Sequence, residues 1–179
     1  MKKSIQTNFN YFIVIFTTIT LSLIPISSMA NKSVYGYLEP VTLLSPDEVT
    51  LTAKLDTGAE TASISAQDIQ LYEKDGEEYV KFTVAHPKME ETLYYDLPIV
   101  RHARIKKRAS ENTETKTHHT RPVVNLPIFF DGESHTIMVN LIDRSHFSTP
   151  MLLGRKALKK VGAIVDSTEK HTLLDDDDY

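Results

Sequence analysis

The chain has 179 residues, of which 41% are hydrophobic and 25% are charged, enough for one globular domain and too few for two of ordinary size. Its formal net charge of −4 predicts that the protein does not bind nucleic acid, because proteins that bind nucleic acids carry a basic surface. The absence of cysteine excludes disulfides, thiolate metal sites and cysteine nucleophiles together.

Residues 1–30 have the pattern of a secretion signal. Two lysines are followed by a mostly apolar run over residues 11–26, and residues 28–30 (Ser-Met-Ala) supply the small side chains that a signal peptidase reads. The apolar run covers about 16 residues, whereas a membrane span needs roughly 20. We therefore expect residues 1–30 to be a cleaved signal peptide and the mature protein to be periplasmic or secreted. Contact with a membrane would come only through an uncleaved signal, which is the alternative.

Most of the remaining sequence predicts β-strands. Residues 35–38 and 49–55 are short runs bounded by proline, serine or aspartate, and 49–55 alternates apolar and polar side chains. Two Asp-Gly pairs, at 75–76 and 131–132, each lie between strand-like runs. These runs are residues 71–74 and 79–84 for the first pair, and 126–130 and 136–142 for the second. Because glycine accepts the positive φ of a tight turn, both pairs predict hairpins, and the body is expected to be a meander of hairpins.

Residues 98–125 predict a long hairpin arm. The segments 98–105 and 121–125 resemble strands, and they enclose a polar tip, residues 106–120, that contains Lys106-Lys107-Arg108 and few apolar side chains. Such a tip buries little surface and is expected to be mobile. Its basic charge suggests substrates or partners of acidic character, and an ordinary solvated loop is the alternative.

The C-terminal part predicts one short helix, residues 155–161, which Gly162 ends. The like-charge run in residues 175–179 predicts an acidic, disordered tail. Residues 31–174 are therefore expected to form one domain.

The pentapeptide Leu55-Asp56-Thr57-Gly58-Ala59 ends the alternating strand, and its residue types suit aspartic catalysis. The carboxylate stands at a strand-to-loop corner, Gly58 allows a close approach of backbone, and Thr57 can brace the loop by a hydrogen bond. Two carboxylates about 3 Å apart share one proton, so that one activates water as a base while the other donates to the scissile carbonyl. Taken alone, Asp-Thr-Gly is equally compatible with a common Asp-x-Gly turn.

A second segment, residues 151–155 (MLLGR), lies near the C-terminus, and together the two segments resemble the retropepsins. The chain is similar above all to a bacterial group of retropepsin-like proteins, many of which carry the label "ATP-dependent zinc protease". The resemblance covers about residues 35–168, and its hallmarks here are residues 54–61 (KLDTGAET), 121–124 (RPVV), Asp143-Arg144 and 151–155. It implies an all-β fold, the closed barrel of the acid proteases with one short C-terminal helix, in which the arm 98–125 takes the place of the flap.

The resemblance also implies three roles around the site. Asp56, Thr57 and Gly58 would be catalytic, Ala59 and Glu60 would bind substrate, and Leu152, Leu153, Gly154 and Arg155 would support the loop from beneath. Glu60 and Arg155 would form a buried or half-buried bidentate ion pair that holds loop and support together. Two unrelated surface charges are the alternative.

The ATP and zinc of that label have no counterpart in these residues. The six glycines form no phosphate-binding loop, and there is no His-Glu-x-x-His helix. The adjacent His118 and His119 do not share a strand or helix face. Solvated surface positions are expected for His86, His102, His118, His119, His135 and His146. We therefore expect neither a metal nor a cofactor.

The sequence contains one Asp-Thr-Gly loop, whereas a two-lobed aspartic enzyme needs two such loops and about twice this length. We therefore expect a homodimer, in which Asp56 meets its twin on the two-fold axis. The leading hypothesis is an aspartic endopeptidase that hydrolyses bonds in peptides or proteins. The second is a non-catalytic periplasmic module that binds peptides or proteins and retains the fold, because fold alone does not establish turnover.

Overall fold

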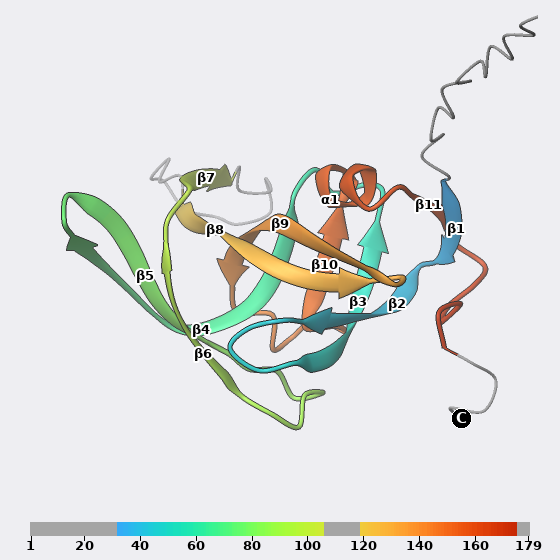
Figure 1. Cartoon of the computed structure of the whole chain (residues 1–179), viewed down its shortest axis with the longest axis horizontal. Helices are drawn as coiled ribbons and strands as arrows, with labels where there is room; N and C mark the ends of the chain where they lie inside the picture. Colours follow the sequence, from blue (N-terminus) through green and yellow to red (C-terminus); the bar gives the residue numbers. More distant parts are fainter. Residues whose placement is uncertain (1–31, 106–118, 175–179) are drawn as a thin grey trace, which may run out of the picture.

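The computed structural model describes residues 32–105 and 119–174. The predicted signal peptide, nearly all of the predicted polar tip and the predicted acidic tail lie outside these residues. The elements run in the order β1 Ser33–Gly36, β2 Leu38–Leu43, β3 Val49–Asp56, β4 Ala62–Lys74, β5 Glu77–Val84, β6 Leu93–Pro98, β7 Arg101–Ile105, β8 His119–Phe130, β9 Glu133–Ile142, β10 Met151–Gly154, α1 Arg155–Lys160 and β11 Ala163–Asp166 (Figure 1).

Six of these strands form a closed barrel, in the order β10-β3-β2-β8-β9-β4. The short strand β10 closes it, because it pairs in parallel with β3 on one side and antiparallel with β4 on the other. Side chains that alternate along the strands fill the interior, among them Leu51, Ala53 and Leu55 of β3. The predicted fold class, an all-β closed barrel with one short C-terminal helix, is confirmed.

The strand β4 serves two sheets. Its first residues pair with β9 inside the barrel, and from Ala66 onward it pairs with β5, with a break in register between Gln67 and Gln70. Asp68, at this break, has a positive φ of 51°, typical of a bulge that turns a strand out of one sheet into another. The resulting β4–β5 hairpin extends away from the barrel (Figure 1), and β6 pairs with the edge of β5 that is opposite to β4.

Both predicted Asp-Gly hairpins are present. Asp75 and Gly76 have φ values of 54° and 80°, and Asp131 and Gly132 have values of 48° and 77°. Positive φ at both central residues is typical of the tight turn whose twist matches paired strands. The predicted helix is also found: α1 ends at Lys160, and Gly162 follows with a φ of 69°. Among the described residues, no helix has the length and apolar character that crossing a membrane requires.

The predicted meander is wrong in one respect, because three strand pairs are parallel: β10 with β3, β4 with β9, and β1 with β11. The predicted strand 98–105 is also divided. β6 ends at Pro98, then the amide of Ile99 donates to Glu78 and that of Val100 donates to Val123, so the chain crosses between sheets before β7 begins. Antiparallel pairing of β7 with β8 forms the base of the predicted arm.

A fully buried carboxylate joins the two ends of the domain. Glu39 is 0% exposed, and its Oε1 accepts hydrogen bonds from the backbone of Gly36 (2.6 Å) and from both the backbone (3.0 Å) and the hydroxyl (2.7 Å) of Thr172. Its Oε2 accepts from the amide of Leu173 at 3.2 Å. Glu39 therefore fastens the C-terminal segment against β2.

We expect the substitution Glu39→Gln to lower the free energy of unfolding by about 1–3 kcal/mol, because one acceptor oxygen becomes an NH2 group that faces the amide of Leu173. Chemical denaturation measures the change. Glu48→Gln, at an exposed position between β2 and β3, is the matched control and should leave stability unchanged. Equal stability of the two variants would contradict the role of Glu39 in holding the C-terminal segment against β2.

Candidate active site

The carboxylate of Asp56 stands at the end of β3, where the chain leaves the barrel. Its side chain is 29% exposed. Oδ1 accepts hydrogen bonds from the amides of Gly58 (2.9 Å) and Ala59 (3.3 Å), and Oδ2 lies 3.8 Å from the ammonium of Lys54. The turn that follows the strand thus fixes one oxygen with its own backbone, whereas the other accepts no hydrogen bond from the described residues.

Small side chains are needed in this turn. A Cβ atom at Gly58 would lie 3.1 Å from Oδ1 of Asp56, closer than most real contacts of this kind. Thr57 and Gly58 are exposed, Ala59 is half-buried and Glu60 is exposed. The structure therefore brings the predicted catalytic and substrate-binding residues onto one surface loop.

The segment beneath the loop fits it closely. Gly154 is the register partner of Asp56 in the parallel pair of β10 and β3. A Cβ atom at Gly154 would lie 2.6 Å from the carbonyl oxygen of Thr61 and 2.9 Å from that of Ala59, so glycine alone fits here. Leu153 is fully buried in the core and Leu152 is half-buried on the opposite face of β10.

Two adjacent residues bind four consecutive carbonyl groups of the loop, those of residues 57–60. The guanidinium of Arg155 donates through Nη1 to the carbonyl oxygens of Thr57 (3.1 Å) and Gly58 (3.0 Å). At the start of α1, the amide of Arg155 donates to Ala59 (2.9 Å) and the amide of Lys156 to Glu60 (3.1 Å). The start of α1 thereby holds the Asp56 loop in one conformation.

The predicted ion pair of Glu60 with Arg155 is wrong. Glu60 pairs with Lys156, at 2.8 Å, and both side chains are more than half exposed. This contact is the main cause that lowers the pKa of Glu60, while Arg155 contributes only through weaker attraction. The physical reason is that Arg155 uses its guanidinium on loop carbonyls, which places its neighbour opposite the acid.

We expect the substitution Arg155→Ala to lower the free energy of unfolding by about 1 kcal/mol, because two exposed hydrogen bonds to carbonyl groups are lost. The loop should also become more mobile, with faster amide exchange at Gly58 and Ala59. Hydrogen exchange measured residue by residue checks this. Lys156→Ala is the matched control, since it removes a neighbouring charge but keeps both backbone contacts, and equal exchange rates in the two variants would contradict the role of Arg155.

A buried arginine beside the site received no role from sequence analysis. Arg144 is 4% exposed, its Nε donates to the carbonyl oxygen of Thr149 (3.1 Å) and its Nη1 donates to Oγ of Ser63 (3.0 Å). Burial lowers the pKa of Arg144, and the carboxylate of Asp56 opposes this shift. In the sequence, Asp143-Arg144 is only part of the retropepsin resemblance, and no local pattern indicates that Ser63, 81 residues away, is the partner of Arg144.

One of the predicted surface histidines is buried. His86 is 7% exposed; its Nδ1 accepts from the amide of Lys88 (3.1 Å), and its Nε2 therefore donates to the carbonyl oxygen of Phe147 (3.2 Å). His146 is exposed and His102 and His135 are half-buried, whereas His118 and the side chain of His119 lie outside the described part of the chain. Within that part, no three histidine or acidic side chains gather into a possible metal site.

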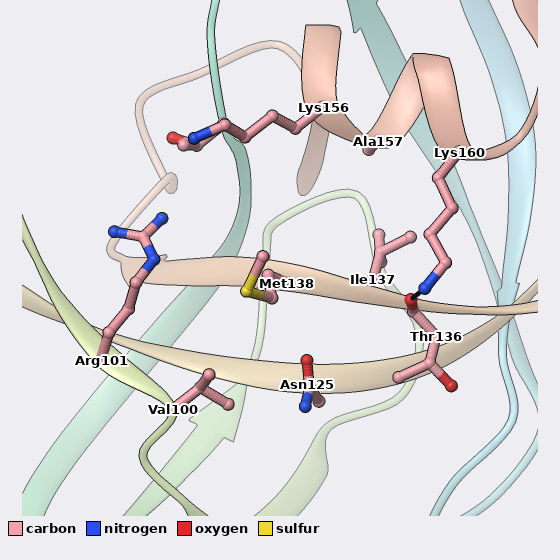
Figure 2. A pocket seen from close by; sticks show the side chains of 10 residues that line it. Val100, Arg101, Asn125, Thr136, Ile137, Met138, Lys156, Ala157 and Lys160 are labelled. Atoms are coloured by element: carbon pink, nitrogen blue, oxygen red, sulfur yellow. Dashed lines mark hydrogen bonds between the residues drawn. The ribbon is translucent and has the colours of Figure 1, made fainter.

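A cavity of about 290 Å³ lies next to the Asp56 loop. Its lining includes Lys156 and Thr61, the residue just after the loop. Figure 2 shows the basic side chains of Arg101, Lys156 and Lys160 arranged around Ile137 and Met138. Lys160 also donates to the backbone carbonyl of Thr136. The surface next to the Asp56 loop is therefore apolar at its floor and positively charged at its rim.

The closed barrel, the Asp-Thr-Gly turn and the Gly-Arg segment beneath it define a retropepsin-like protein. Residues 34–174 match the family described as "Retropepsin-like aspartic endopeptidase RimB", and the chain belongs to this RimB-like family, as the sequence motifs predicted. The crystal structure of a Legionella pneumophila protein of unknown function (DUF785) has the same fold, with a TM-score of 0.65 and 35% sequence identity, over 80% of this chain and 100% of that chain.

The chain is also similar to part of larger proteins that are named "Probable alpha-L-glutamate ligase". The one from Desulfotalea psychrophila is 35% identical over 111 residues, which make up 60% of this chain and 22% of that protein. The one from Parasynechococcus marenigrum is 30% identical over 151 residues, 82% of this chain and 30% of that protein. The chain thus spans between 22% and 30% of the length of these two relatives.

Proposed function

We propose that this protein is an aspartic endopeptidase whose active site forms when two copies bring their Asp56 carboxylates together. The observation that carries the proposal is the corner at the end of β3, where loop amides hold Oδ1 of Asp56 while α1 fixes the loop from behind. A structural turn needs the amide contacts but not a second layer of four hydrogen bonds. Such bracing suits a carboxylate that must keep its place during a reaction.

In the proposed dimer the two carboxylates share one proton. The ionised carboxylate removes a proton from a water molecule, which attacks the scissile carbonyl carbon, and the protonated one donates its proton to the carbonyl oxygen. Collapse of the resulting gem-diol breaks the C–N bond and passes a proton to the leaving amine, which restores the shared-proton pair. One Asp-Thr-Gly loop per chain is the reason for requiring two chains.

The substrates we propose are peptides that contain glutamate. The relatives named as glutamate ligases carry a similar domain within a longer polypeptide, and a ligase of that name joins glutamate to another molecule. A peptidase domain beside it would meet glutamate-containing chains. The basic rim formed by Arg101, Lys156 and Lys160 next to the Asp56 loop is compatible with such substrates, because it attracts carboxylates.

Hydrolysis of a peptide library tests the proposal, with cleavage products identified by mass spectrometry. We expect the wild type to cleave, a statine-type inhibitor to block cleavage, and Asp56→Asn to show none. Equal cleavage by wild type and Asp56→Asn would end the enzyme hypothesis. Binding of peptides without cleavage would support the second candidate, a peptide-binding module that retains the fold.

A further inference from the structure

The guanidinium of Arg144 is a buried charge that forms no close ion pair with any carboxylate of the described residues. Its two hydrogen bonds go to neutral oxygens, the carbonyl of Thr149 and the hydroxyl of Ser63. Among residues 32–105 and 119–174, no Asp or Glu forms an ion pair with it. Buried charges in proteins are ordinarily paired, because removing an ion from water costs several kcal/mol. A carboxylate from a molecule that binds the protein would explain why the guanidinium of Arg144 is buried without an ion-pair partner among the described residues.

The guanidinium lies on the face of the sheet that carries Asp56. Ser63, Leu152 and Lys54 are register neighbours across β4, β10 and β3, so their side chains share one face. Asp56 follows Lys54 by two residues and projects to the same side, where their charged groups lie 3.8 Å apart. Arg144 binds Ser63 on this face. Lys54 and Arg144 therefore share a face with the Asp56 carboxylate, and of these two cations only Lys54 lies within ion-pair distance of it.

An exposed aromatic ring covers the buried cation. The ring of Phe147 is centred 4.6 Å from Cζ of Arg144, and the residue is 53% exposed. Its backbone is fixed at both ends, since its amide donates to the carbonyl oxygen of Arg144 (2.7 Å) and its carbonyl accepts from the buried His86 (3.2 Å). A large apolar side chain is thus kept at the surface next to a charge, as in sites that bind a group with both apolar and charged parts.

We propose that Arg144 is a specificity residue of the active site, whose guanidinium binds the carboxylate of an acidic substrate side chain next to the scissile bond. This inference rests on the proposed function. The substrate carboxylate supplies the close ion-pair partner that the described residues do not provide, and Phe147 packs on the aliphatic part of the same side chain. Nη2 of Arg144 has no partner among the described residues and is the donor left for this contact.

The basic cavity of Figure 2 explains such a preference less well. Lys156 there already pairs with Glu60, and Arg101 and Lys160 are exposed, so their charges are screened by water and salt. A buried guanidinium is screened much less and discriminates more strongly between a charged and a neutral side chain.

Matched pairs of internally quenched peptides test the inference. Each pair differs only by Glu or Gln at one of the four positions nearest the cleaved bond. We expect wild type to cleave the Glu peptide about 10- to 100-fold faster in kcat/KM at one position, the range expected for a charged hydrogen bond. Arg144→Gln should lower the ratio of the Glu rate to the Gln rate to about one. Arg144→Lys should retain part of the preference, because it keeps the positive charge. It should lose the rest, because lysine lacks the planar guanidinium that donates two parallel hydrogen bonds to a carboxylate.

Lys74→Gln, at the tip of the β4–β5 hairpin, removes the same net charge and should leave the preference unchanged. A folded Arg144→Gln that slows both peptides equally, or a wild type without any preference, overturns the inference. If Arg144→Gln fails to fold, the comparison rests on Arg144→Lys, and an unchanged Glu-to-Gln ratio in that variant overturns it. If the wild type cleaves nothing, the proposed function fails. Calorimetric binding of both peptides to Asp56→Asn then decides for or against Arg144 independently, by the ratio of their Kd values.

Discussion

Equal amounts of wild-type and Asp56→Asn chains, unfolded and refolded together, should retain about a quarter of the activity of the same total amount of wild type. Random assortment leaves about one dimer in four with two Asp56 residues, and a dimer with one carboxylate replaced cannot form the shared-proton pair. Asp56→Asn alone should lose activity by about a thousandfold or more, since both acid and base catalysis fail. Initial rates of peptide cleavage at several mixing ratios measure the effect.

The same experiment separates a dimeric from a monomeric active site. If each chain worked alone, activity would fall in proportion to the wild-type share, to about half at equal amounts. Mixing with Lys74→Gln, at the tip of the β4–β5 hairpin outside the barrel, is the control and should leave the rate unchanged. A linear rather than a quadratic dependence on the wild-type fraction would contradict the dimer.

Replacement of Gly154 by alanine should cause the largest loss of stability. The added Cβ would lie 2.6 Å from the carbonyl oxygen of Thr61 and 2.8 Å from its carbonyl carbon, and both are backbone atoms that rotation of a side chain cannot move. We expect the free energy of unfolding to fall by about 3 kcal/mol or more, at the upper end of the range for overpacking, and the Asp56 loop to shift. Thermal and chemical denaturation measure the first effect.

Gly76→Ala is the control for this substitution. A Cβ at Gly76 meets nothing within 4 Å, but its φ is positive at 80°, so the expected cost is that of left-handed backbone, about 1–2 kcal/mol. A variant Gly154→Ala no less stable than Gly76→Ala would show that β10 can move away from the loop. The close fit beneath Asp56 would then not be required for folding.

Local chemistry was sufficient to predict some parts of the fold. The two Asp-Gly pairs favour the positive φ of a tight turn wherever they occur. The alternation of apolar and polar side chains along β3 reflects one face that lies in the barrel interior and one that lies outside it. The first half of β4 was missed because its small side chains, such as Ala62 and Ser63, have no strong strand preference. Its conformation comes from pairing with β9 and β10 at once. β11 was missed for a similar reason, since its partner β1 lies at the other end of the domain.

The candidate site likewise has a part that local sequence predicts and a part that depends on contacts between distant residues. Asp56 and its loop were predicted because their chemistry is contained in a few adjacent residues. The partner of Glu60 was misplaced by a single position, from Arg155 to Lys156, because the direction of each side chain at the start of α1 depends on what the loop carbonyls bind. Arg144 reaches its buried position, and with it the role proposed above, only when distant strands place Ser63 beside it, which no local pattern encodes.

The parallel pairing of β10 with β3 also has a consequence for the order of events during synthesis. These strands lie at opposite ends of the domain sequence, at residues 151–154 and 49–56, and contacts of such high sequence separation form slowly. A ribosome must release nearly the whole domain before β10 can insert between β3 and β4. Unfinished chains therefore lack the brace behind Asp56, and the proposed hydrolytic activity is withheld until translation is nearly complete.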